Sequence, residues 1–209
     1  MKLYRYTLVT DSGFAPNPYG GYCTLAACKP KIRENARVGD WIAGFGSARR
    51  GHSGQLVYAM RVAETMTFEQ YWCDPRFAAK KPRQSTCYEE TCGDNVYHRD
   101  SDGRWHQEYC FHCSAEMSKD LSVNRVLVAT EFVYYGDQSI ELPSEIACLG
   151  EAHFAGIRGH RVNDLSSDAV RAIISWFQDL CSDGGMQGSP AQTQQIIASG
   201  HASVPRRRC

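Results

Sequence analysis

The stretch DSGFAPNPYGGYCTLAACKPKIRENARVGDWIAGFGS, residues 11–47, decides how the first half of this chain folds. A β-rich segment, Lys2–Thr10, precedes it, and the apolar segment Trp41–Phe45 lies near its end. Both segments are typical of strands. The loop between them is rich in Gly, Pro, Asn and Asp, and a long ordered loop more often forms a binding or catalytic surface than a plain connection. We therefore expect the functional surface to include this loop.

Further strands are predicted on both sides of the centre of the chain. Gln55–Glu64 alternates with apolar residues on one face, and Arg125–Ala129 and Glu131–Tyr135 are rich in β formers. The sequence Asp100-Ser101-Asp102-Gly103 predicts a hairpin turn, because Gly accepts the positive φ that such a turn requires. Short helices are expected at residues 31–36, 67–72 and 143–149.

One long helix is predicted near the C-terminus, over Ser167–Cys181. Its apolar residues recur at helical spacing, and Ser166 or Ser167 can cap its first turn. Gly184-Gly185 ends it, and the Gly-, Ser- and Gln-rich remainder indicates a flexible tail. The expected fold is α+β: a mostly β mixed barrel with short helices and one C-terminal amphipathic helix, as a single domain over 1–183 followed by a tail over 184–209.

Composition places the chain among ordinary globular proteins. Of its 209 residues 43% are hydrophobic, and 23 basic residues balance 23 acidic ones. A zero net charge favours binding of a single nucleotide or a short extruded segment over a long duplex. No apolar signal region and no membrane-length apolar run is present, so we expect a cytoplasmic location, no membrane partner and reduced cysteines.

Aromatic and polar residues in the loops suggest recognition of a nucleobase. A base that leaves its stack is held by aromatic rings and by groups that read its edge. Phe14 and Trp105, beside polar turns, are the expected stacking residues, and Asp11, Asn17 and Asn95 are the expected readers of the base edge. Residues expected to complete the pocket or to meet phosphate are Ser12, Cys23, Lys29, Phe45, Gly46, Ser47, Arg49, Arg50, Lys80, Lys81 and Arg83.

Two other chemistries remain open. Cys87, Cys92, Cys110 and Cys113 have a loose version of zinc-ligand spacing, with incidental thiols as the alternative, and we expect no cofactor. Acid–base chemistry is open to Asp94, His98 and His112, and His106 is a further possible base. No dinucleotide fingerprint, phosphate-binding loop, HExxH or deaminase signature is present.

The chain also resembles a known family, the second type of nucleotide modification associated domain. Seven blocks carry the resemblance: DSGFAPNP, CTLAACKPKIR, GDWIAGFGS, LVYAMRV, YWCDPRFAAKKP, GDNVYHRDSDGRWHQ and RVLVATEFVYYG. The cysteines at 73, 87, 92, 110 and 113 are not part of that pattern. The resemblance implies a role in making or recognising modified DNA bases, in bacteria and phages, without defining a reaction.

A looser resemblance is to the PUA-like barrels of the EVE, YTH and ASCH group. It rests on the first strand, the Gly39-Asp40 turn, Phe45-Gly46-Ser47 and the Asp74-Pro75 pair. It implies a pocket for a modified base between the first loop and the end of the second strand, with Phe45 in place of a tyrosine. Three functions follow as alternatives: a reader of a modified base, an enzyme that modifies a base or nucleotide, and a protein-interaction module.

Overall fold

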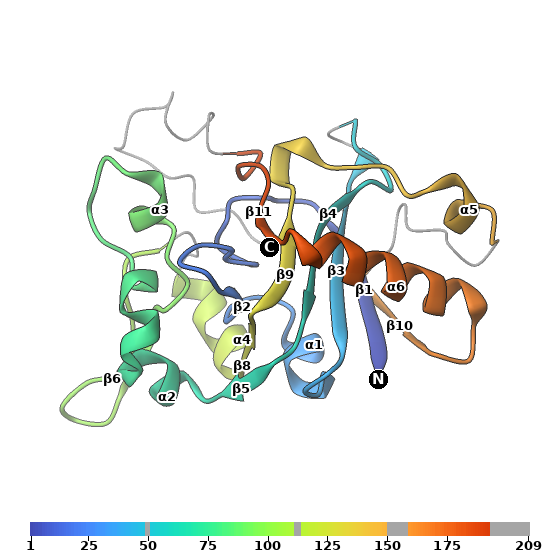
Figure 1. The fold of residues 1–209 in the computed structure, drawn as a ribbon. Helices are drawn as coiled ribbons and strands as arrows, with labels where there is room; N and C mark the ends of the chain where they lie inside the picture. The colour runs from blue at the N-terminus through green and yellow to red at the C-terminus, as the bar shows by residue number, and fades with distance from the viewer. Residues whose placement is uncertain (49–50, 111–113, 150–158, 193–209) are drawn as a thin grey trace. The chain divides into compact units, whose positions relative to one another are not determined.

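The computed structural model describes residues 1–48, 51–110, 114–149 and 159–192 (Figure 1). The chain divides into two compact units, each built from separate stretches of sequence. The described residues of unit 1 fall within 1–10, 36–63 and 129–190, and those of unit 2 fall within 11–35, 64–128 and 191–192. Among the described residues, no helix combines the length and the apolarity that a bilayer span would need.

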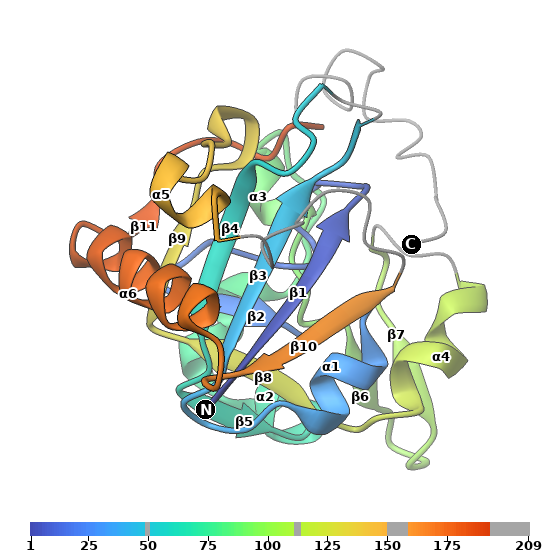
Figure 2. The ribbon, with the colours of Figure 1, turned by 90° about the vertical axis from the view of Figure 1, so that its right-hand side faces the viewer.

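Unit 1 is a mixed six-stranded sheet in the order β10-β1-β3-β4-β9-β11 (Figure 2). β1 runs parallel to β3, and β3, β4 and β9 are antiparallel neighbours. The strands are β1 (Lys2–Leu8), β3 (Trp41–Gly46), β4 (Leu56–Arg61), β9 (Glu131–Tyr134), β10 (His160–Asp164) and β11 (Gly185–Met186). All six residues of β3 are buried, as expected for a central strand.

The long helix α6 (Asp168–Ser182), which the sequence predicted over Ser167–Cys181, packs on this sheet. Its buried residues Val170, Ile173, Ile174 and Phe177 join Trp41 in one hydrophobic cluster, in which the rings of Trp41 and Phe177 lie 5.6 Å apart. Figure 1 shows the helix running across the strands of the sheet. The unit also contains η4 (Gly136–Gln138) and α5 (Ser144–Ala147).

Unit 2 has little sheet and many short helices around its own hydrophobic cluster. Its strands form one three-stranded sheet, β2-β8-β5, and one hairpin, β6-β7. The strands are β2 (Cys23–Leu25), β5 (Glu64–Met66), β6 (Tyr97–Arg99), β7 (Trp105–Gln107) and β8 (Val126–Ala129). The helices are α1 (Pro30–Asn35), α2 (Phe68–Cys73), η2 (Pro75–Lys80), α3 (Tyr88–Thr91), η3 (Ser114–Glu116) and α4 (Met117–Leu121).

The predicted α+β class, rich in strands and short helices, is confirmed, whereas the predicted barrel does not close. The six-stranded sheet ends at β10 and β11, which do not pair with each other in the described part of the chain. The two residues of β11 offer too short an edge to extend the sheet further. β11 also follows the predicted domain boundary at 183/184, and its pairing with β9 attaches the first residues after that boundary to unit 1.

Candidate functional site

The loop after β1, where the sequence predicts a binding surface, is anchored inside unit 2 by Lys80. Its ammonium donates to the backbone oxygen of Asn17 at 3.1 Å, to the Asn17 side-chain oxygen at 2.6 Å and to the Tyr22 carbonyl at 3.0 Å. The amide nitrogen of the Asn17 side chain donates to the carbonyl of Cys92. Asn17 is 1% exposed, so its side chain is engaged within the protein.

Asp94 lies in the same buried polar network. Its two carboxylate oxygens accept the hydroxyl groups of Thr24 and Tyr71, each at 2.7 Å. Burial raises the pKa of Asp94 and lowers the pKa of Lys80, while the opposite charge of each partner works against its shift. The network joins the first loop to the segment around η2, and its hydrogen bonds satisfy groups that would otherwise be costly to bury.

The other predicted residues of the first loop are also buried. Phe14 is 1% exposed and belongs to the hydrophobic cluster of unit 2, so its ring presents no face to solvent. The Ser12 carbonyl accepts the Tyr88 hydroxyl at 2.7 Å, and the Asp11 carboxylate accepts the backbone NH of Ala191 at 3.0 Å. Cys23 is fully buried in β2.

Asn95 and Lys29 lie elsewhere in unit 2. The Asn95 amide nitrogen donates to the carbonyls of Tyr71 and Phe77, and within the described residues its side-chain oxygen has no partner. Asn95 is 1% exposed, so this oxygen faces the interior. Lys29 is half-buried, and its positive φ of 43° places it at the bend that enters α1.

The remaining predicted residues of the pocket belong to unit 1 or lie outside the described residues. Phe45, Gly46 and Ser47 are buried at the end of β3. The Ser47 hydroxyl is buried and has no hydrogen-bond partner in the described part of the chain. Arg49, Arg50, His112 and Cys113 lie outside the described residues.

The β6–β7 hairpin brings several candidate residues to the surface of unit 2. Its turn is stabilised by Asp100, whose carboxylate accepts the backbone NH groups of Asp102 and Arg104, and Gly103 has the expected positive φ of 75°. Within the hairpin His98 is paired with His106, and Arg99 is paired with Trp105. Since side chains alternate between the faces of a strand, these two pairs project to opposite sides.

One side of the hairpin packs on α2. Trp105 is half-buried, and its ring lies edge-on to Phe68 at a centroid distance of 6.0 Å. The guanidinium carbon of Arg99 lies 4.3 Å from the Trp105 centroid, and Arg99 also forms an ion pair with Glu69 at 3.1 Å. Trp105 is therefore already covered by neighbours of its own chain.

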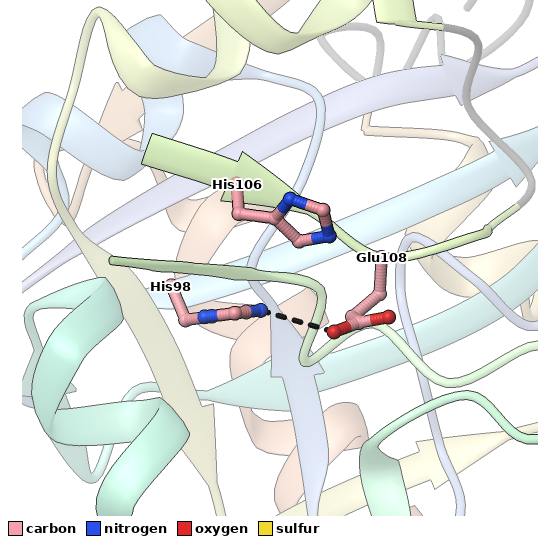
Figure 3. Close-up of side chains that lie close together, drawn as sticks. All are labelled: His98, His106 and Glu108. Atoms are coloured by element: carbon pink, nitrogen blue, oxygen red, sulfur yellow. Dashed lines mark hydrogen bonds and ion pairs between the residues drawn. The ribbon is translucent and has the colours of Figure 1, made fainter. Parts of the chain in front are cut away.

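The other side of the hairpin gathers imidazole, carboxylate, indole and ammonium groups. The Trp72 ring stacks on the His98 ring at 4.0 Å with an interplanar angle of 19°, and the Lys81 ammonium lies 3.9 Å from the Trp72 centroid. His98 and His106 both point toward Glu108, and His98 Nε2 lies 3.0 Å from Glu108 Oε1 (Figure 3). We call this surface the Trp72–His98 face; its residues are Trp72, Lys81, His98, His106 and Glu108.

Lys81 was expected to contact phosphate, and His98 and His106 were possible bases. Trp72 was one of many aromatic residues without a specific role, and Glu108 was not a candidate. A sequence signal exists for His98 and His106, which lie symmetrically about the Asp-Gly turn. For Trp72 no such signal exists, because it reaches the hairpin from a different element.

The described cysteines of the proposed zinc set lie in different environments. Cys87 is exposed, while Cys92 and Cys110 are buried. Cys110 Sγ lies 3.2 Å from the side-chain nitrogen of Gln107. Burial raises the pKa of the Cys92 thiol to about 12, and a metal-binding thiol must instead lose its proton.

This difference predicts selective alkylation. In the native protein at pH 8 we expect iodoacetamide to modify Cys87 at least about tenfold faster than Cys92, because only the thiolate reacts and Cys92 is both protonated and buried. Peptide mass spectrometry over time measures both rates. Unfolding in urea is expected to equalise them, and equal rates in the native state would contradict the burial of Cys92.

Unit 2 also has an open depression of about 430 Å³ beside β5 and the start of η2. Glu64 and Asp74 lie on its walls, and of the described residues that line it none is basic. The carboxylates of both residues bind Arg76, at 3.0 and 2.6 Å. The described residues that line the depression include neither a basic side chain nor an aromatic ring, so it is a weaker candidate for nucleotide binding than the Trp72–His98 face.

Comparison with known proteins supports one assignment. A search of curated proteins and a search of solved structures each gave no match. The family model described as nucleotide modification associated domain 2 matches residues 1–196, which confirms the resemblance predicted from the sequence blocks. With nearly the whole chain covered by that match, the protein belongs to the nucleotide modification associated domain 2 family.

Proposed function

We propose that this protein recognises a nucleobase or nucleotide through the Trp72–His98 face. The observation that carries the proposal is the stack of Trp72 on His98 at 4.0 Å, with the Lys81 ammonium 3.9 Å from the centre of the same indole. Stacked aromatic rings beside mobile cations are the means by which proteins bind unpaired bases and their phosphates. Membership in a nucleotide-modification family makes such a ligand the natural one.

In this proposal each group on the face has a separate role. A base stacks on the Trp72 indole when the flexible Lys81 side chain moves off it, and the ammonium then meets the phosphate. When no metal ion is bound, the exposed His106 imidazole is a further donor to phosphate oxygens. In that state Glu108 offers carboxylate oxygens to an amino group on the base, which would distinguish bases by their edges.

The buried residues of the first loop support this face indirectly. Asn17, Lys80 and Asp94 fix the loop against the segment that leads into α3 and the hairpin. The expected ligand carries a modified base, and the expected setting is DNA base modification or phage defence. Balanced overall charge favours a single nucleotide or a short extruded segment.

Of the described residues of the enzymatic alternative, Asp94 and His98, only His98 belongs to this surface. Asp94 is 1% exposed and hydrogen-bonded on both oxygens, which suits a structural carboxylate better than a group that exchanges protons with a substrate. Measurement of turnover on the same ligands separates the two functions.

Substitution of Trp72 is the direct test. We expect Trp72→Ala to weaken binding of a modified deoxynucleoside monophosphate by about 5- to 150-fold, since stacking contributes about 1–3 kcal/mol per base. The measurement is calorimetric titration of normal and modified deoxynucleosides and their monophosphates. Trp176→Ala is the matched control, because Trp176 is a similarly half-buried indole on α6 of unit 1.

A second substitution separates base from phosphate recognition. Lys81→Met is expected to weaken binding of monophosphates more than binding of the corresponding nucleosides, because it removes only the cation. Equal affinities of the Trp72→Ala variant and the wild-type protein would overturn the proposed site. Saturable binding without turnover would establish a reader, whereas turnover would establish the enzyme.

A further inference from the structure

We propose that His98, His106 and Glu108 form a binding site for a divalent first-row transition metal ion, with zinc as the test ion. Their potential ligand atoms all lie within 4.8 Å of one another. His98 and His106 are directly paired across the hairpin, and Glu108 follows two residues after His106, so alternation places it on the same side. Figure 3 shows both imidazole rings directed toward the Glu108 carboxylate.

The spacing of these atoms is close to that of a metal-bound set. Zinc binds imidazole nitrogen and carboxylate oxygen at about 2.0–2.2 Å, so two such ligands in a tetrahedral site lie about 3.4 Å apart. His98 Nε2 and Glu108 Oε1 lie 3.0 Å apart without an ion. His106 is exposed at the hairpin surface, where a rotation about its side-chain bonds brings it to the third position.

His98 is held in an orientation that suits a ligand. Its Nδ1 lies 3.2 Å from the backbone oxygen of Arg99, and its ring stacks on Trp72. A metal-binding histidine commonly donates its outer N–H to a backbone carbonyl, which directs the other nitrogen toward the metal. A metal ion between Nε2 and the Glu108 carboxylate would replace the direct contact that now joins them.

The donor set selects the class of ion. Two imidazoles and one carboxylate suit zinc and its first-row neighbours, whereas magnesium and calcium prefer sites made of oxygen alone. Three protein ligands leave coordination positions open to water or to an oxygen of a bound molecule. The site is distinct from the cysteine set considered from the sequence, because none of its three ligands is a thiol.

Zinc titration without any nucleotide tests the site separately from the proposed ligand. Tag-free, metal-stripped protein is titrated with zinc chloride by calorimetry, and the bound metal is counted by mass spectrometry. We expect one saturable equivalent per chain. His106→Ala and Glu108→Gln are each expected to weaken binding at least about tenfold, because each removes one ligand from the set.

Two controls make the result specific. His52→Ala removes a described histidine of unit 1 and is expected to leave zinc affinity unchanged. Circular dichroism of each variant verifies folding, and His106 is exposed, so its loss leaves the core intact. Absence of saturable binding by the wild-type protein, or zinc that remains equally bound in a His98→Ala/His106→Ala double variant, would overturn the proposal.

Discussion

Arg33→Ala is expected to reduce the free energy of unfolding of unit 2 by about 3–5 kcal/mol. The Arg33 side chain is completely buried, and its guanidinium donates to the carbonyls of Cys28, Val123, Arg125 and Asp120 at 2.6–2.9 Å. Removal of the guanidinium takes the donor away from these four oxygens, of which those of Cys28 and Asp120 lie in buried hydrogen bonds.

The same substitution also isolates a buried carboxylate. Asp120 is 1% exposed in its side chain and lies 3.8 Å from the Arg33 guanidinium. Its oxygens accept the backbone NH of Cys28 at 2.7 Å and the Tyr97 hydroxyl at 2.8 Å, so it cannot turn toward solvent without breaking both bonds. Burial, reinforced by this carboxylate, raises the pKa of the Tyr97 hydroxyl and keeps it as a donor.

Urea denaturation measures the reduction in the free energy of unfolding caused by Arg33→Ala, and hydrogen exchange of peptides from unit 2 shows where the structure is destabilised. Lys31→Ala is the matched control in the same helix, because Lys31 is exposed and its ion pair with Glu34 contributes little. The control is expected to change stability by less than about 0.5 kcal/mol. Arg33→Lys keeps the charge but lacks the planar fork of donors. Its reduction in the free energy of unfolding should therefore lie between those of Lys31→Ala and Arg33→Ala. A loss below about 1 kcal/mol for Arg33→Ala would show that the network is dispensable.

Asp94→Ala is expected to cause the second large loss, again about 3–5 kcal/mol. The change leaves the Thr24 and Tyr71 hydroxyls without their acceptor. It also removes the carboxylate whose charge supports the buried Lys80 ammonium. Because Lys80 anchors Asn17, the first loop should loosen together with the network.

The Asp94 variants also separate a structural role from a catalytic one. Asp94→Asn keeps the shape and one acceptor, so its stability should lie between those of the wild-type protein and Asp94→Ala. At a temperature where it is folded, its nucleotide affinity should match that of the wild type. Glu90→Ala, at an exposed acidic residue of α3, is the control for loss of a negative charge nearby. A fully stable Asp94→Asn protein that loses turnover would instead favour the enzyme.

Local patterns in the sequence predicted many of the elements. The 3.6-residue spacing of apolar side chains predicted α6, and Thr67 predicted the start of α2, where its hydroxyl accepts the backbone NH of Gln70. The Asp-Gly turn predicted the hairpin. These features depend on neighbours within a few residues, so the chain encodes them locally. The edge strand β10 was missed because five residues such as His160–Asp164 depend on β1 for their pairing.

The dependence on distant segments also explains why polar residues predicted as binding residues are buried in the structure. Asn17, Asp94 and Asn95 are polar residues in loops, and polarity alone predicted a binding surface. Their long-range partners lie 18 to 75 residues away, from Phe77 for Asn95 to Cys92 for Asn17, and these partners occupy most of their hydrogen-bonding groups inside the protein. A sequence shows that a side chain can form hydrogen bonds, whereas the tertiary structure decides whether the chain or a ligand supplies the partner.

The sequence by itself determined the family, the α+β class, the long helix and the turn that pairs His98 with His106. Only the tertiary structure decided that the chain divides into two units of interleaved segments and that Phe14 is a core residue. It also decided that Trp72 and Lys81 lie beside the hairpin histidines. The physical reason is that burial and side-chain contact depend on segments far apart in the chain, whose packing no local pattern records.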